Sequence, residues 1–286
     1  MEQRKKNNRK KRQSLLWGTI LPGLAALATA GVLALVLFRL IFPGGTSAPS
    51  LPTEETLPPP PANPYVETDF YREGEFIGCT AAPTLTGIDV SSHQKNIDWE
   101  AVKAAGVDFA IIRAGYRGYD QGGLYVDDAW EENAQGALDA GLPIGVYFYS
   151  QAITVEEAKE EAKLVLKAMR GYDITFPVVF DWECVGPQAR TYEATSRMVT
   201  DCTIAFCQEI EKAGYTSAFY FNQSMAMDTF RLRELKEYDF WLAQYKDAMT
   251  FPYDVAMWQY TNKGKVPGIS GDVDLNLSFR NYGGTP

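Results

Sequence analysis

The sequence predicts an α/β fold built around a closed barrel of eight strands. From Thr86 onward, short apolar segments alternate with amphipathic segments, which is the pattern of strands and helices around a parallel sheet. Eight apolar segments fit into about 200 residues, the size of a small (β/α)8 barrel. The last three lie too close together for helices between them, so we expect a barrel with few helices at its end.

The expected elements follow one another along the chain. We place strands at 86–92, 109–116, 143–150, 176–183, 216–223, 239–245, 254–260 and 271–278. We place helices at 98–106, 127–141, 154–171, 194–214 and 224–238. The first four of these helical segments end in glycine, a residue that is frequent just past a helix.

An open, doubly wound sheet is the alternative arrangement of the same elements. Such a sheet usually carries G-x-G-x-x-G after its first strand, whereas this chain has DVSSHQ at 89–94. The glycine-rich segment GYRGYDQGG at 115–123 lacks the lysine and the spacing of a P-loop. We therefore favour the barrel and interpret 115–123 as a surface loop.

The N-terminal part of the chain differs in chemistry from the rest. Residues 1–14 form a basic tail of net charge +6, and residues 15–42 are apolar except for Arg39. This apolar run exceeds the about 20 residues that a helix needs to cross a bilayer, so we interpret it as a transmembrane signal-anchor. A signal peptide cleaved after Ala28-Thr29-Ala30 is the alternative. A Pro-rich linker (43–64), a short extension (65–84) and the barrel (85–282) are expected to follow.

Charge and cysteine content restrict the location and the partners. The positive-inside rule places the basic tail in the cytoplasm and the barrel outside the cell. Subtracting +6 and the charge of Arg39 from the total of −9 leaves −16 for residues 43–286, which argues against nucleic acid as a partner. Disulfides are permitted there and free buried thiols are an equal alternative, so the state and any pairing of Cys79, Cys184, Cys202 and Cys207 stay open. His93 is the only histidine and the cysteines fit no zinc motif, so we expect no metal and no cofactor.

Acidic residues stand at the ends of three expected strands. The apolar run 176–180 ends in Asp181-Trp182-Glu183, and alternation along a strand makes Asp181 and Glu183 point the same way, about 6.6–6.8 Å apart along the backbone. Two acids this close raise the pKa of at least one of them, as an enzyme needs when it uses one carboxylic acid and one carboxylate. Asp89 ends the first strand and Asp274 lies in the last, its neighbour in a closed barrel.

Aromatic and amide side chains accompany these acids. Rings that stack on sugar faces, beside carboxyl groups that handle a proton, are what glycosidic cleavage requires, although we expect about half of the barrel aromatics to serve packing. We assign substrate binding to Tyr116, Tyr149, Tyr220, Asn222, Gln244 and Trp258.

Seven short motifs follow one another along the chain: GIDVSSHQ…IDW, FAIIRAGY, GVYFYS, FDWE, WLAQY, MWQYT and GDVDLNL. In these motifs and in their order, the sequence resembles glycoside hydrolase family 25, the Chalaropsis-type and phage-endolysin-like muramidases. The resemblance covers residues 85–282. It implies a TIM-like, irregular (β/α)5(β)3 barrel that hydrolyses the β-1,4 bond between N-acetylmuramic acid and N-acetylglucosamine in peptidoglycan. It also implies Glu183 as general acid/base, Asp181 as partner carboxylate, and Asp89 and Asp274 as further acids of the site. Phe148 departs from the family, since many members carry histidine there.

Several alternatives stay open at this point. Asp181 either attacks the anomeric carbon or steadies the substrate's own N-acetyl group as that group attacks, and the resemblance favours the second mechanism. A non-catalytic glycan-binding scaffold and a glycosidase of another N-acetylated polymer are rival functions. We expect a monomer. No repeats typical of a cell-wall-binding module follow the barrel, so we expect the membrane anchor to replace such a module.

Overall fold

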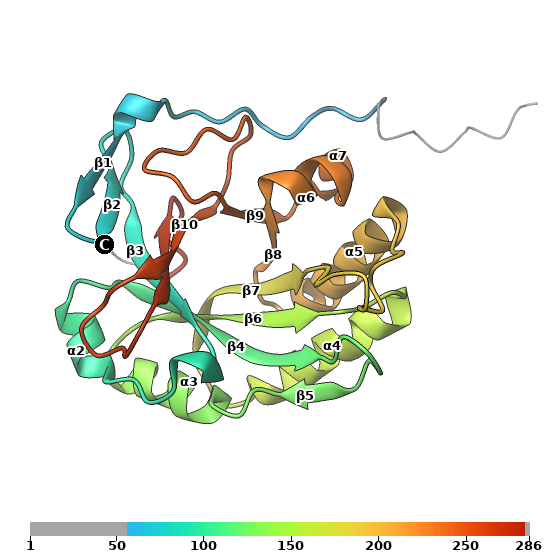
Figure 1. Cartoon of the computed structure of the whole chain (residues 1–286), viewed down its shortest axis with the longest axis horizontal. Coiled ribbons are helices and arrows are strands. Elements are labelled where there is room, and N and C mark those ends of the chain that lie inside the picture. Colours follow the sequence, from blue (N-terminus) through green and yellow to red (C-terminus); the bar gives the residue numbers. More distant parts are fainter. Residues whose placement is uncertain (1–55, 284–286) are drawn as a thin grey trace, which may run out of the picture. The chain divides into compact units, whose positions relative to one another are not determined.

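A closed barrel of eight strands forms the centre of the computed structural model, which describes residues 56–283 (Figure 1). Its strands are hydrogen-bonded in the order in which they occur in the chain, and the last one closes the barrel against the first. They are β3 (Leu85–Val90), β4 (Phe109–Arg117), β6 (Ile144–Ser150), β7 (Ile174–Trp182), β8 (Ser217–Asn222), β9 (Asp239–Ala243), β10 (Met257–Gly264) and β11 (Val273–Ser278). The predicted α/β barrel is therefore confirmed.

The direction of the last strand differs from the parallel arrangement that we expected. The first seven strands of the barrel run parallel to one another, whereas β11 is antiparallel to both β10 and β3. The connection from Gly264 to Val273 is too short for a crossover, which takes a dozen residues or more, so the chain turns back as a hairpin. Hence β11 begins, rather than ends, at the carboxyl ends of the other strands.

Helices lie outside the barrel and follow the first five of its strands. They are α2 (Trp99–Ala104), α3 (Trp130–Asp139), α4 (Val155–Ala168), α5 (Ser196–Lys212), α6 (Gln223–Asp228) and α7 (Leu232–Leu235), with 3-10 turns η2 (Glu67–Asp69) and η3 (Ser92–Gln94). Thr154 caps α4 by accepting a hydrogen bond from the Glu157 amide. The single helix predicted at 224–238 is instead divided into α6 and α7, because Phe230 between them turns into the core, where it is 4% exposed.

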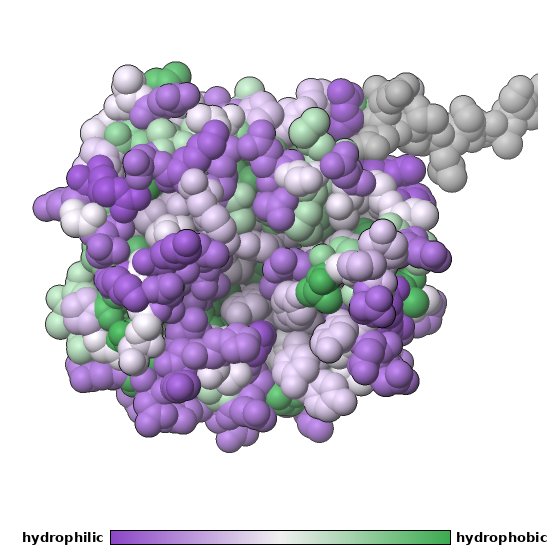
Figure 2. All heavy atoms as spheres, in the orientation of Figure 1, coloured by the Kyte–Doolittle hydropathy of each residue, from purple (hydrophilic) through white to green (hydrophobic). Residues whose placement is uncertain are grey.

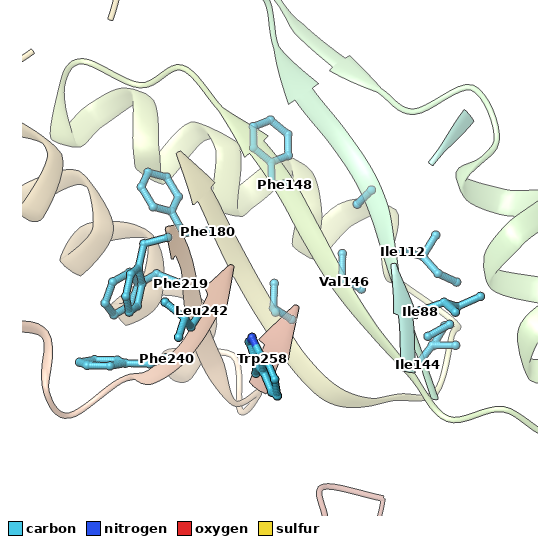
Figure 3. Close-up of a cluster of buried hydrophobic side chains, with 14 of the residues drawn as sticks. Ile88, Ile112, Ile144, Val146, Phe148, Phe180, Phe219, Phe240, Leu242 and Trp258 are labelled. Carbon is cyan, nitrogen blue, oxygen red and sulfur yellow. The ribbon is translucent and has the colours of Figure 1, made fainter. Parts of the chain in front are cut away.

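The hydrophobic core has two layers, one on each side of the barrel strands. Inside the barrel, Phe109 stacks on Phe176 with ring centroids 4.3 Å apart. The larger outer layer lies between strands and helices, and Figure 3 shows Phe148, Phe180 and Phe219 in it, from β6, β7 and β8. Since both faces of each strand are covered, the strands read as continuous apolar runs. On the outside, Figure 2 shows a mostly hydrophilic face with small, separate hydrophobic patches.

The glycine-rich segment 115–123 is a surface loop only in part, since residues 118–123 form a turn and residues 115–117 belong to a strand. Strand β4 continues to Arg117, and the chain returns as β5 (Leu124–Val126), which pairs antiparallel with β4 beyond the closed barrel. Glycine is required where the hairpin is tight. Gly122 has a φ of 70°, and a Cβ on Gly115 would lie 2.3 Å from the Tyr125 carbonyl oxygen.

The segment before the barrel packs against it. Strands β1 (Phe70–Glu73) and β2 (Phe76–Cys79) form a two-stranded antiparallel sheet, and Phe70 meets Trp258 edge to face with centroids 5.2 Å apart. Residues 61–63 lie along the loop between β9 and β10, and the Leu57 carbonyl accepts a hydrogen bond from Arg233 of α7. There the Asn63 amide donates to the Pro252 carbonyl, and the Asp254 amide donates to the Pro61 carbonyl, each over 2.9 Å. This part of the predicted linker is held on the barrel and is not a free spacer.

The expected basic tail (1–14), signal-anchor (15–42) and first part of the linker lie outside the described residues. Within residues 56–283, no helix combines the length and the apolar character needed to cross a membrane. The four cysteines are free thiols. Cys79, Cys202 and Cys207 are buried, and Cys184 is exposed.

Candidate active site

A cleft of about 250 Å³ opens at the carboxyl ends of the parallel barrel strands. The cleft is lined by all four acids that the sequence analysis assigned to the site. Of the six residues assigned to substrate binding, Tyr149 and Tyr220 line it as well. The lining residues are Asp89, Arg113, Tyr147, Tyr149, Asp181, Glu183, Tyr220, Trp241, Tyr245, Gln259 and Asp274.

The topology of the barrel explains why the four acids meet. Asp89 lies near the end of β3 and pairs in register with Asp274 at the start of β11, which is possible because β11 is antiparallel. Asp181 is the penultimate residue of β7, and Glu183 follows that strand directly. Acids from the first, fourth and last barrel strands therefore share one end of the barrel.

Asp181 and Glu183 face the cleft together, as strand alternation predicts. A side-chain hydrogen bond joins the two carboxyl groups. Trp182 between them points the other way, and its indole Nε1 donates to the Ala152 carbonyl over 2.9 Å. Asp181 is only 6% exposed, whereas Glu183 is more accessible at the cleft rim. The pair is thus one deep and one accessible carboxyl group that share a hydrogen bond.

Burial dominates the electrostatics of this pair. Desolvation raises the pKa of Asp181 well above its usual range, and the neighbouring Glu183 raises it further. Desolvation also raises the pKa of Glu183, although the hydrogen bond with Asp181 opposes this shift. Two neighbouring carboxyl groups with raised pKa values keep a proton to a higher pH than isolated carboxyl groups do. Such a proton is what a general acid at this position requires.

Asp89 and Asp274 form the second part of the acidic cluster. Two buried amides, Gln259 Nε2 and Asn276 Nδ2, each donate to Asp89 Oδ2 over 2.8 Å. Burial raises the pKa of Asp89 to about 6, and the two amides oppose the shift. Burial and the charge of Asp89 raise the pKa of Asp274 to about 8. Asp89 is therefore fixed by the barrel, and Asp274 is kept protonated beside it.

Arg113 is the single cation among the described residues that line the cleft. Its Nε donates to Asp127 Oδ2 over 2.7 Å, and its Nη2 donates to Ser92 Oγ over 3.3 Å, so the guanidinium is fixed. Its charge lowers the pKa of Asp181, against the effect of burial. Arg113 thus favours the ionised form of the deeper carboxyl group.

Aromatic rings surround the acids at the level of Asp181. Tyr149 on β6 and Tyr220 on β8 pair in register with Asp181 on either side, and Trp241 on β9 pairs with Tyr220. The hydroxyl groups of Tyr220 and Tyr245 both donate to Gln259 Oε1, over 2.9 and 3.0 Å. The rings are therefore oriented by hydrogen bonds as well as by packing.

Three of the residues assigned to substrate binding have structural roles instead. Trp258 is fully buried, packs on Phe70 and donates from Nε1 to the Gln244 carbonyl, so it offers no ring face to a ligand and that assignment is wrong. The buried Gln244 side chain accepts from the Thr250 amide. Asn222 caps α6 by accepting from the Met225 amide. Tyr116 lies one strand beyond Tyr149, outside the cleft lining.

Sequence reasoning missed Arg113, Tyr245, Gln259 and Asn276. Arg113 is the only charge in an apolar strand segment (FAIIRAGY), and Asn276 alternates with Asp274 in DVDLNLS. A charge or amide that interrupts a buried strand needs a partner inside the fold, and that signal was available for both residues. For Gln259 and Tyr245 nothing local distinguishes them from surface polar residues.

The backbone at Glu183 is held by the fully buried side chain of Gln151. Its Nε2 donates to the Glu183 carbonyl over 2.5 Å and to the Ser150 carbonyl over 2.9 Å. Its Oε1 accepts from Thr191 Oγ1 over 3.0 Å. Gln151 therefore connects the end of β6 with the loop that follows Glu183.

A second group of buried charges lies behind the cleft, between the strands and α4. Glu161, fully buried, accepts from Arg117 Nε and from Ser150 Oγ, each over 2.7 Å. Arg117 also donates to the carbonyls of Gly122 and Glu157. We call Arg117, Glu161 and Ser150 the paired cluster, because the acid and the base satisfy each other.

No group of three or more histidine, cysteine, aspartate or glutamate side chains within residues 56–283 has the arrangement of a metal site. The chemistry that this cleft itself can supply is that of carboxyl groups next to aromatic rings.

Comparison with known proteins is consistent with this chemistry. The family model of glycosyl hydrolases family 25 matches residues 88–269. The uncharacterized protein YegX of Escherichia coli K12 is 27% identical over 227 residues, which cover 74% of this chain and 77% of YegX. Lysozyme M1 of Streptomyces globisporus is 30% identical over 223 residues, 70% of this chain and 69% of that lysozyme.

Among solved structures, the modular autolysin LytC of Streptococcus pneumoniae is similar, with a TM-score of 0.58 and 26% identity. The match covers 68% of this chain but only 46% of LytC. LytC has also been solved in complex with a synthetic peptidoglycan ligand.

Proposed function

Because the chain belongs to glycosyl hydrolases family 25, and is thus a glycoside hydrolase of the lysozyme type, we propose that it is a peptidoglycan hydrolase. Its substrate would be the β-1,4 bond between N-acetylmuramic acid and N-acetylglucosamine. The names of Lysozyme M1 and of LytC with its peptidoglycan ligand support this substrate class. The observation that carries the proposal is the hydrogen-bonded pair of Asp181 and Glu183 in a cleft lined by tyrosines and Trp241.

Glu183 acts as the general acid in this proposal. It is the more accessible carboxyl group of the pair, and its raised pKa keeps a proton available for the leaving oxygen. Once the sugar has left, the same group takes a proton from the attacking water. Arg113 lowers the pKa of Asp181, against the larger effects of burial and of the neighbouring Glu183. In this proposal, the pair delivers its proton to the leaving oxygen through the more accessible Glu183.

Asp181 assists the substrate's N-acetyl group rather than attacking the sugar itself. A direct attack needs carboxyl groups about 5–5.5 Å apart, on either side of the sugar bond. Here the two groups are hydrogen-bonded to each other from the same face of one strand. Moreover, Asp181 Oδ1 is buried and has no hydrogen-bond partner in the described part of the chain, so it is available to the N–H of an N-acetyl group. Loss of cleavage when the substrate lacks N-acetyl groups would support this mechanism, whereas a trapped covalent glycosyl-enzyme would contradict it.

Asp89 and Asp274 position this pair and bind sugar hydroxyl groups. Asp89 is fixed by Gln259 and Asn276, and Gln259 in turn orients Tyr220 and Tyr245. Tyr149 and Tyr220 flank Asp181 on the neighbouring strands, where their rings can stack on the sugar.

We also propose that the enzyme acts as a monomer at the cell membrane, with its barrel outside the cell. The apolar run 15–42 behind a tail of charge +6 supports an uncleaved signal-anchor. Recovery of the full-length chain in the membrane fraction, with only the barrel accessible to external protease, is the expected result. A secreted chain that starts after Ala30 would contradict it.

Digestion of purified peptidoglycan by the full-length protein tests the activity. We expect new reducing ends at N-acetylmuramic acid, identified by mass spectrometry of the reduced fragments. Glu183→Gln should strongly reduce the release of these reducing ends. Cleavage of chitin but not of peptidoglycan would indicate a glycosidase of another N-acetylated polymer. Binding without cleavage of either polymer would indicate a glycan-binding scaffold.

A further inference from the structure

The hairpin of β4 and β5 extends the aromatic lining of the cleft beyond the closed barrel. Tyr125 on β5 pairs in register with Tyr116 on β4, and Tyr116 pairs with Tyr149 on β6. Tyr149 pairs with Asp181. We call Tyr125, Tyr116, Tyr149 and Asp181 the cross-strand row. Side chains in register point to the same face, so this row leads from the acids outward along one side of the sheet.

The outer two rings of the row are held in place. The rings of Tyr116 and Tyr125 are stacked, with centroids 5.2 Å apart and an interplanar angle of 24°. The guanidinium of Arg113, itself fixed by Asp127, lies over the Tyr116 ring at 5.5 Å. The turn of the hairpin is also fixed, since Arg117 donates to the Gly122 carbonyl and the Arg190 amide donates to the Tyr119 carbonyl.

Tyr125 is nevertheless 52% exposed. Its ring packs so closely over the turn that a Cβ on Gly123 would lie 2.8 Å from its hydroxyl oxygen. The glycines of segment 115–123 thus allow a flat aromatic surface to lie on the backbone. An aromatic side chain that is held in place and is half exposed can bind the apolar part of a ligand at little cost in conformational entropy.

We propose that Tyr125, supported by Tyr116, is a distal subsite for an amino-sugar unit of the glycan strand. Strands lie about 4.8 Å apart, so Tyr125 is roughly 14 Å from Asp181 across three strand spacings. This distance exceeds one sugar ring. The subsite therefore binds a unit beyond those at the cleaved bond and selects long strands over short ones. This inference rests on the proposed peptidoglycan substrate.

Binding by the full-length chain tests the subsite without depending on turnover. In the Glu183→Gln background, Tyr125→Ala should weaken binding of long glycan strands by about 3–10-fold, the effect of losing one aromatic stacking contact. It should leave binding of a disaccharide unchanged. Tyr125→Trp should restore the affinity. Tyr71→Ala is the matched control, because Tyr71 is 48% exposed and also packs over a glycine, Gly78, on the separate β1–β2 hairpin.

The outcomes separate the subsite from the activity. If Tyr125→Ala binds long strands as tightly as Tyr71→Ala does, the subsite is refuted, whatever the enzyme cleaves. An equal loss for long and short ligands refutes it as well, because the residue would then act through the cleft. Strands stripped of their stem peptides should bind equally well, and a loss of binding to them would refute a sugar ligand. Failure of the wild-type chain to cleave peptidoglycan would refute the proposed function instead.

Discussion

Two groups of buried acids lie a few residues apart in this protein, and they are built in opposite ways. In the paired cluster, Glu161 has Arg117 and Ser150 as close partners. In the cleft, Asp89, Asp181, Glu183 and Asp274 face one another, and Arg113 is the only cation among the described residues around them. In the paired cluster a cation compensates the buried acid, although burial still raises the pKa of Glu161 to about 7. In the cleft the acids are one another's neighbours, and burial together with their mutual repulsion raises the pKa values of Asp181 and Asp274. The two groups therefore differ in the partners of their acids, and this difference points to the cleft as the active site.

Adjacent residues connect the two groups. Ser150, the last residue of β6, donates to Glu161, and Gln151 donates to the carbonyl of Glu183. A change in either group should therefore show whether stability and catalysis can be separated. The following variants test this separation, from the largest expected effect to the smallest.

Glu183→Gln should lower kcat by about 10²–10⁴-fold, because the general acid is lost. The free energy of unfolding should not fall, since the change removes one of four crowded acids. Peptidoglycan digestion and thermal unfolding of the same preparation measure the two quantities. Glu160→Gln, at an exposed acid on α4, is the control for activity. Near-normal turnover of Glu183→Gln would remove Glu183 from its proposed role.

Glu161→Gln should have the opposite effect, with a loss of stability of about 3–5 kcal/mol, because Arg117 is left as a buried charge without its main partner. Glu160 also contacts Arg117, at 3.3 Å, but its side chain is 58% exposed. Glu160→Gln should therefore cost less than about 1 kcal/mol. Denaturant unfolding distinguishes the two. Equal losses of stability in the two variants would show that burial does not make the Arg117–Glu161 ion pair more stabilising than the exposed one.

Gln151→Met should affect both properties moderately. It leaves the Glu183 carbonyl and the Thr191 hydroxyl without the amide partner, which costs about 1–3 kcal/mol. If Gln151 positions Glu183, kcat should fall while KM stays nearly constant, and the pH profile should shift. Gln135→Met, at an exposed glutamine on α3, is the control. A loss of stability with an unchanged kcat and pH profile would make Gln151 purely structural.

The last prediction concerns the dependence of the free energy of unfolding on pH. The pKa of Asp274 is raised from 3.8 to about 8, so the folded state binds its proton more tightly than the unfolded state does. The stability that this gives is fully present below pH 3.8 and is lost as the pH rises to about 8. Asp274→Asn should therefore flatten the fall in stability across this range, as measured by thermal unfolding.

Asp272→Asn provides a control of opposite sign two residues earlier. Asp272 is exposed, and its ion pair with Lys265 lowers its pKa. The contribution of this ion pair to stability is therefore lost when the pH falls below the usual pKa of an aspartate. In Asp272→Asn, the slope of stability against pH between about pH 4 and 8 should stay as in the wild type. If Asp272→Asn and Asp274→Asn gave the same slope, the buried acid would not be the cause.

Local pattern was sufficient for the barrel and for the acidic pair. An apolar run that ends in Asp181-Trp182-Glu183 identifies a central strand and the face to which both acids point. The direction of the last strand was harder to predict, because the alternation of apolar and polar residues in DVDLNLS is the same for a parallel and an antiparallel strand. Only the short connection before Val273 distinguishes them.

The two tryptophans show why the site was incompletely predicted. Trp241 in FWLAQY faces the cleft, and Trp258 in the similar MWQY lies in the outer core beneath Phe70. Both faces of a barrel strand are apolar, so local sequence does not reveal which residues point inward. The hairpin that covers Trp258 lies far away in the chain. Gln259, one residue on, was missed for the same reason.

The contact of residues 57–63 with the barrel has a consequence for access to the substrate. Asp239 begins β9 and Met257 begins β10, and these starting ends lie opposite the cleft. Pro60 and Pro61 lie beside Asp239 and Asp254 at that end. Residues 57–63 therefore meet the barrel at the end opposite the cleft, and they leave the rim of the cleft open to a long polymer.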